Sequence, residues 1–178
     1  MGVIRLLKGW PGKPSHPPLT DASIGAYTVG VAMLVLGAFG VEEEPMAHGA
    51  LLATGGGLAL AGPTALTGLL DWLDLPKGTP ARTTATTHLL AMVTATLLFA
   101  LSFVVQLDGY DEGHVETLAL VLGLAAEAVL TLGGYLGGTI VFVYGVRVLK
   151  RPETPVAEAL VPGRAERAQA ARRPPLGD

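Results

Sequence analysis

Residues 84–107 read TATTHLLAMVTATLLFALSFVVQL, a stretch of 24 residues without one charged side chain. An α-helix rises 1.5 Å per residue, so about 20 apolar residues cross the ~30 Å hydrocarbon core of a bilayer. Arg82 and Asp108 flank the stretch and mark where it would meet water. The stretch therefore predicts a transmembrane helix.

Three more apolar stretches surround it, separated by charged and Pro/Gly-containing segments. They cover residues 19–41, 47–70 and 117–149. Half of all residues are hydrophobic, the mean hydropathy is +0.49 and only 15% of residues are charged, which is too apolar for an ordinary soluble domain. We expect an all-α integral membrane four-helix bundle over residues 16–150.

The basic residues set the orientation of this bundle. All twelve Lys and Arg residues precede the first span, separate the second from the third, or lie at the end of the fourth and after it. The other two loops, 42–46 and 108–116, carry only acidic charge. Because Lys and Arg near membrane spans stay on the cytoplasmic side, both termini are predicted to be cytoplasmic, in a multi-pass protein of the bacterial inner membrane.

The chain on either side of the spans differs from them in composition. Residues 1–15 interleave Arg5 and Lys8 with apolar residues, as in a short amphipathic segment that lies in the headgroup region of the lipid bilayer. Residues 151–178 are rich in Pro, Ala and Arg, which predicts a disordered or loosely helical cytoplasmic tail. The absence of cysteine excludes disulfides and thiolate ligands.

Polar residues gather near the predicted cytoplasmic helix ends. This predicted layer contains His16, Asp21, Asp71, Trp72, Arg82, His88, Tyr144 and Arg147. Ionisable groups at membrane depth are costly unless paired, so an ion pair between Asp71 and Arg82 that fixes the short loop between them is the simplest explanation for those two. His16, Asp21 and His88 are the candidate metal ligands in the layer.

Two histidines on different helices suggest a cofactor. His16 and His88, with Trp72 nearby, are candidate contacts for a haem b or a quinone, because axial ligation of a b-type haem needs two imidazoles at similar depth. The obstacle is that His16 precedes the first span and is predicted at the membrane rim. His48 and His114 offer a looser pair at the opposite end.

Glu127 lies near the centre of the fourth span, far from any basic residue. Thr131, Gly134 and Gly138 follow it at helical spacing, which favours a stripe that faces the bundle interior. An intramembrane acid is either functional, in proton transfer or ligand contact, or a neutral group that hydrogen-bonds two helices. Both interpretations remain open.

Small residues on the fourth span predict close helix packing. Gly133, Gly134, Gly137 and Gly138 form two overlapping small-xxx-small pairs. Such pairs let helix backbones approach in lipid, where hydrophobicity does not drive association. We expect these glycines to pack against other helices of the same bundle. The alternative is that they form the interface of a homo-oligomer.

Several of these motifs together resemble a bacterial family of predicted membrane proteins with a domain of unknown function. The matching motifs are His16-Pro17, Gly68 to Trp72, Thr86-Thr87-His88, Gly133 to Gly138 and Tyr144-Gly145-Val146. The resemblance covers residues 16–149 and implies a four-helix membrane fold. Where family members typically have a second histidine, this chain has Asp21. Some relatives are fused to Rieske-type iron–sulfur domains, which implies a redox partner.

No motif of a soluble enzyme is present, because the chain lacks a phosphate-binding Gly loop after a strand, an HExxH and a serine nucleophile elbow. We therefore expect a non-catalytic or redox-accessory membrane subunit and no nucleic-acid partner. The alternatives are a haem b or quinone module that uses His16 and His88, and a small proton or ion conductor centred on Glu127.

Overall fold

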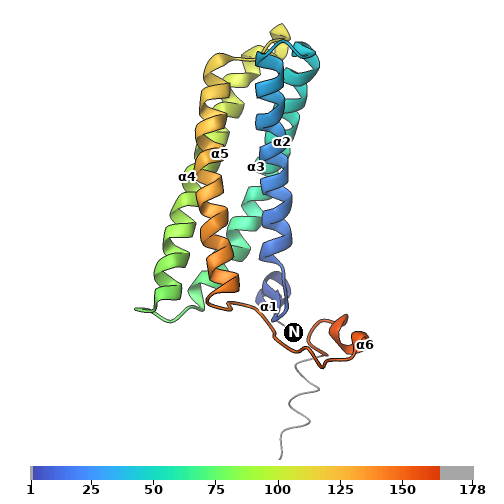
Figure 1. The fold of residues 1–178 in the computed structure, drawn as a ribbon, viewed down its shortest axis with the longest axis vertical. Helices are drawn as coiled ribbons and strands as arrows, with labels where there is room; N and C mark the ends of the chain where they lie inside the picture. Colours follow the sequence, from blue (N-terminus) through green and yellow to red (C-terminus); the bar gives the residue numbers. More distant parts are fainter. Residues whose placement is uncertain (1, 165–178) are drawn as a thin grey trace, which may run out of the picture.

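The computed structural model describes residues 2–164, and in this part of the chain four long helices form an up-and-down bundle (Figure 1). These helices are α2 (His16–Ala38), α3 (Glu43–Leu73), α4 (Pro80–Glu112) and α5 (Thr117–Phe142). Each is long and apolar enough to cross a membrane. The fold class expected from the apolar stretches is thereby confirmed at the level of a helical protein with four candidate spans.

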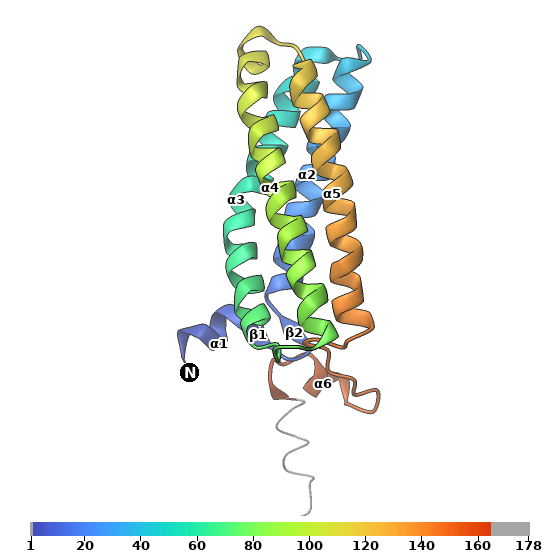
Figure 2. The same cartoon turned by 90° about the vertical axis from the view of Figure 1, so that its left-hand side faces the viewer.

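Short elements surround one end of the bundle. Helix α1 (Val3–Lys8) leads into a small antiparallel hairpin of β1 (Gly9–Trp10) and β2 (Lys13–Pro14), and α6 (Val156–Ala159) follows the bundle. They lie with the α3–α4 loop at the end that we call the basal end (Figures 1 and 2). The opposite end, with the α2–α3 and α4–α5 loops, is the distal end. Of the predicted tail, residues 165–178 lie outside the described residues.

The ends of the helices follow local backbone rules. The side chain of Thr79 caps α4 by accepting a hydrogen bond from the Arg82 backbone N–H, and Pro80 follows in the first turn, where no N–H is needed. Helix α5 ends at Phe142, seven residues before the expected boundary at Leu149. The backbone φ angles of Gly145 (66°) and Arg147 (61°) are positive, and a right-handed helix cannot continue through them.

The helices pack as two hairpins. Helix α2 packs mainly against α3, and α4 mainly against α5. Large apolar side chains such as Leu52, Leu90 and Leu132 lie on the outside, each more than 60% exposed. The buried polar residues are Ser23, Thr54, Thr64, Thr67, Ser102 and Gln106. An apolar exterior around a partly polar interior is the distribution expected when the surrounding solvent is lipid.

An aromatic pair fills the centre of the bundle. Tyr27 on α2 stacks on Phe99 on α4 with ring centroids 4.0 Å apart and planes only 3° from parallel. Ala95 and Ala126 are fully buried beside them. Gly57 on α3 admits the Tyr27 ring, because a Cβ there would lie 2.6 Å from the Tyr27 Cδ1 atom. Small residues thus let α2, α3, α4 and α5 close around two rings.

The glycines of α5 divide into two groups. A Cβ at Gly133 would meet Met92 and one at Gly137 would meet His88, so these two glycines pack against α4. Gly134 has nothing within 4 Å of its missing Cβ, and Gly138 meets only Phe142 of its own helix. Packing within the bundle therefore accounts for Gly133 and Gly137. A homo-oligomer seam would have only Gly134 and Gly138 available.

Candidate functional site

Two imidazoles meet inside the basal half of the bundle. His16 is the first residue of α2, and His88 lies eight residues after the start of α4 at Pro80, ~12 Å along the helix. Their ring centroids are 6.5 Å apart and their planes are nearly perpendicular, at 84°. Both residues are partly buried. The structure therefore brings together the two histidines that the sequence singled out.

Each imidazole is fixed by a backbone carbonyl of the neighbouring helix in its own hairpin. His16 Nδ1 lies 3.0 Å from the carbonyl oxygen of Thr64 on α3, and His88 Nδ1 lies 2.8 Å from that of Gly133 on α5. A carbonyl oxygen only accepts hydrogen bonds, so in both rings Nδ1 carries the proton and donates. Both Nε2 atoms then keep a lone pair, which is the tautomer that a metal-ligating histidine needs.

A glycine makes room for each ring, four residues after the acceptor carbonyl. A Cβ at Gly68, four residues after Thr64, would lie 2.6 Å from His16 Cε1. A Cβ at Gly137, four residues after Gly133, would lie 3.2 Å from His88 Cε1. The two hairpins thus hold their histidines in the same way. Sequence reasoning missed the roles of these residues, and the shared four-residue spacing is the signal that could have indicated them.

His16 lies at the start of α2 and packs against the interior of α3. Its ring contacts Thr64, which lies nine residues before Leu73, or ~13 Å inside the end of α3. Helix α2 begins at His16 itself rather than at Leu19, so His16 is the first residue of a candidate span. Thr20 Oγ1 also lies 3.5 Å from His16 Nε2, but its single hydroxyl proton is donated to the His16 backbone carbonyl at 2.9 Å, so the Nε2 lone pair stays available.

The donor set limits what this pair could hold. In residues 2–164, no group of three or more His, Cys, Asp or Glu side chains is arranged to bind a metal ion. Asp21, the predicted third ligand, is exposed on α2 and does not join the pair. Haem needs only two axial ligands, because the porphyrin supplies the other four. His16 and His88 could each supply one such ligand atom through Nε2, from rings whose centroids lie 6.5 Å apart.

Trp72 and Arg82 close the α3–α4 loop. The Arg82 guanidinium stacks 3.4 Å above the centre of the Trp72 ring and donates to the backbone carbonyls of Trp72 (2.6 Å) and Leu75 (2.9 Å). The Trp72 indole N–H donates to Thr86 Oγ1. The expected ion pair between Arg82 and Asp71 was wrong, because the guanidinium donates instead to the Trp72 and Leu75 carbonyls, where the chain leaves α3.

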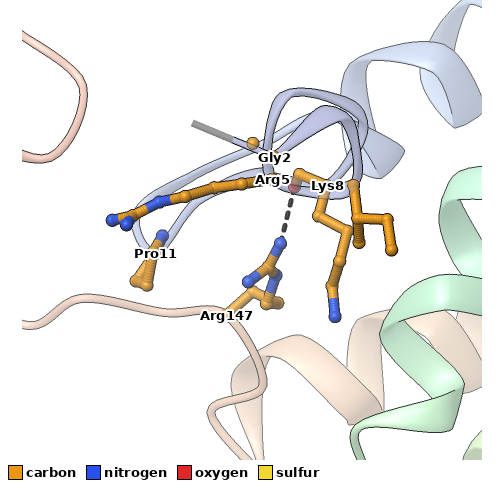
Figure 3. Close-up of a pocket in the computed structure, with 7 residues that line it drawn as sticks. Gly2, Arg5, Lys8, Pro11 and Arg147 are labelled. Atoms are coloured by element: carbon orange, nitrogen blue, oxygen red, sulfur yellow. Dashed lines mark hydrogen bonds between the residues drawn. The ribbon is translucent and has the colours of Figure 1, made fainter.

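Asp71 forms its ion pair with Arg147, at 3.0 Å. Arg147 also donates to the backbone carbonyl of Lys8 at 2.6 Å (Figure 3). The Lys8 ammonium pairs with Asp74. These contacts connect α1, α3 and the chain after α5. Lys8 and Asp74 were not among the predicted site residues. Tyr144, which was, has an exposed hydroxyl that accepts a hydrogen bond from Thr84.

Glu127 connects α5 to α2 rather than facing the bundle interior along a stripe. Thr28 Oγ1 donates to Glu127 Oε1 at 2.9 Å, and Oε2 is buried without a partner among the described residues. Thr131 is exposed and donates to the backbone carbonyl of Glu127, and Gly134 faces open space. The predicted inward stripe was wrong, because α5 buries the face that contains Ala126, Leu130 and Gly133.

The distal histidines do not repeat the basal arrangement. His48 donates through Nε2 to the Tyr110 carbonyl at 2.9 Å, so its protonated nitrogen is the opposite one from that of His16 and His88. His114 lies in the α4–α5 loop with Glu116 and Glu112 on its two ring nitrogens. Each distal histidine thus has partners of its own. The basal pair is the more suitable place for a shared ligand.

Comparison with known proteins gives one match. A family model described as "Predicted membrane protein (DUF2231)" matches residues 12–150, which is most of the chain and includes the basal histidine pair. No curated protein and no solved structure matches the chain.

Proposed function

The chain belongs to the DUF2231 family of predicted membrane proteins, and from this premise we propose that it is a redox-accessory membrane subunit that binds a b-type haem between His16 and His88. The observation that carries the proposal is the matched tautomer of the two facing imidazoles. In both rings, Nδ1 donates a hydrogen bond to a backbone carbonyl, and Nε2 keeps the lone pair with which it could bind a metal. Haem held there would supply one-electron transfer.

The protein's own residues prepare this site in three ways. The Thr64 and Gly133 carbonyls orient the rings and raise the basicity of the ligand nitrogens. Gly68 and Gly137 leave the space in which the rings stand. The third contribution is the surrounding apolar exterior of the bundle, which keeps bulk water away from the pair.

The proposal also includes an orientation and a partner. The basal end carries the basic residues, so it would lie in the cytoplasm, and the protein would belong to the bacterial inner membrane. A redox site near that surface suits electron exchange with another membrane redox protein, such as one with a Rieske-type domain. Glu127 would have a structural part, since its bond to Thr28 joins the weakly packed α2 and α5.

An absorption spectrum of the full chain tests the function. Protein purified in mild detergent from haem-replete cells should show a Soret band, and His16→Ala and His88→Ala should each remove it. His48→Ala is the matched control, because His48 is also an imidazole bound to a carbonyl but lies at the distal end. Colourless wild-type protein, or an unchanged spectrum in His88→Ala, would exclude haem ligation by this pair.

A further inference from the structure

A cationic cavity lies at the basal end, between the N-terminal segment and the chain that follows α5. It is open to the outside, and its volume is about 480 Å³. Arg5, Lys8 and Arg147 line it together with Ile4, Pro11 and backbone of Gly2 and Gly9 (Figure 3). No carboxylate is among the lining residues. The cavity is therefore suited to an anionic group.

Two of the three cationic side chains are held in place from outside the cavity. Asp71 fixes Arg147 at 3.0 Å, and Asp74 fixes Lys8, while neither aspartate lines the cavity. Arg147 additionally donates a hydrogen bond to the Lys8 carbonyl, which joins the two residues directly. Guanidinium groups positioned in advance bind phosphate oxygens with little loss of side-chain entropy.

Helix α1, which contributes Ile4 to the cavity, also exposes apolar side chains beside it. Val3, Ile4 and Leu6 of α1 are 71%, 62% and 56% exposed, and none of the residues of α1 is buried. Figure 2 shows α1 projecting sideways beyond the bundle at its base. Because the four long helices cross the membrane, a short helix that projects from their end lies where headgroups meet acyl chains. In that position the apolar side chains of α1 are removed from contact with water.

We propose that this cavity binds the phosphate headgroup of an anionic phospholipid in the leaflet around the basal end, with the acyl chains against α1. The positive charge of the cavity alone would bind any phosphate group. The exposed apolar side chains beside the cationic cavity favour a ligand that is both anionic and amphiphilic. Lipid bound there would hold α1 and the hairpin at the membrane surface.

Native mass spectrometry of the full chain tests the proposal. The protein in mild detergent is titrated with phosphatidylglycerol, and separately with phosphatidylcholine as the zwitterionic comparison. One cationic residue near a membrane surface changes the affinity for anionic lipid by about fivefold. Arg5→Gln should therefore weaken phosphatidylglycerol binding about fivefold and leave phosphatidylcholine binding unchanged.

Lys150→Gln is the matched control, because Lys150 is an exposed cation at the same end but does not line the cavity. It should leave the phosphatidylglycerol affinity unchanged, and both variants should have the thermal unfolding temperature of the wild type. Equal binding of the two lipids by the wild type, or an equal effect of the two substitutions, would overturn the proposal. Displacement of phosphatidylglycerol by millimolar inorganic phosphate would also overturn it, since the cavity would then be a site for free anions. Neither the lipid titration nor the thermal unfolding measurement depends on haem.

Discussion

At the scale of single residues, the orientation of the His16 and His88 rings depends on the carbonyls and glycines that contact them. Each ring needs a carbonyl acceptor for Nδ1 and a residue without a side chain where the ring stands. Thr64 and Gly68 supply both for His16. Because a methyl group at Gly68 would lie 2.6 Å from the ring, closer than real contacts allow, either the ring or α3 would have to shift.

Replacement of these glycines by alanine should therefore disturb the histidine pair in a graded way. We expect Gly68→Ala to destabilise the protein by about 1–3 kcal/mol, the usual cost of overpacking, and Gly137→Ala less, since its Cβ would be 3.2 Å from His88. Gly134→Ala is the control: it meets open space and should stabilise α5 by roughly 0.5–1 kcal/mol. Thermal unfolding in detergent measures this order, and equal effects of Gly68→Ala and Gly134→Ala would contradict it.

At the scale of the elements, the basal end is closed by contacts between segments far apart in sequence. Arg147 lies just after α5 in a backbone conformation with φ of 61°, which turns the chain beneath the bundle. From there it reaches Asp71 on α3 and Lys8 on α1. Arg82 separately closes the α3–α4 loop through carbonyls and the Trp72 ring. The N-terminal segment thus depends on the end of α3 for its position.

Asp71→Asn should loosen this closure while the bundle stays folded. Asp71 and Arg147 form an ion pair without a hydrogen bond between the two paired atoms, so loss of the charge leaves Arg147 less restrained at a cost of about 1 kcal/mol. Hydrogen exchange measured by mass spectrometry should become faster in residues 3–14. Asp108→Asn, an exposed carboxylate at the other end of α4, is the control and should leave that exchange unchanged. Unchanged protection in Asp71→Asn would show that the ion pair does not hold the segment.

At the scale of the whole molecule, the bundle buries several polar residues and exposes many of its leucines. Two hairpins, each with one histidine bound to a carbonyl of its second helix, join across the Tyr27–Phe99 stack. The basic residues at the basal end and the acidic loops at the distal end give the molecule a charge asymmetry along its axis. This asymmetry underlies the proposed orientation.

Single cysteines in this cysteine-free chain test the orientation directly. With Asp111→Cys, a membrane-impermeant maleimide should label intact spheroplasts, because the distal loops are proposed to face outward. With Lys77→Cys, labelling should appear only after the membrane is permeabilised. Both positions are exposed in the structure, so differences in burial do not explain a difference in labelling. The reverse pattern would place the basal end outside the cytoplasm.

The sequence by itself determined the membrane-spanning helices and the layer in which His16 and His88 lie. Span length and flanking charge are local properties, set by the thickness of the bilayer and the cost of moving cations across it. Only the tertiary structure decided which groups meet: Asp71 with Arg147 rather than Arg82, Glu127 with Thr28, and each imidazole with a carbonyl four residues before a glycine. Helices that are apolar on all sides do not encode their rotation about their own axes, and that rotation selects every one of these contacts.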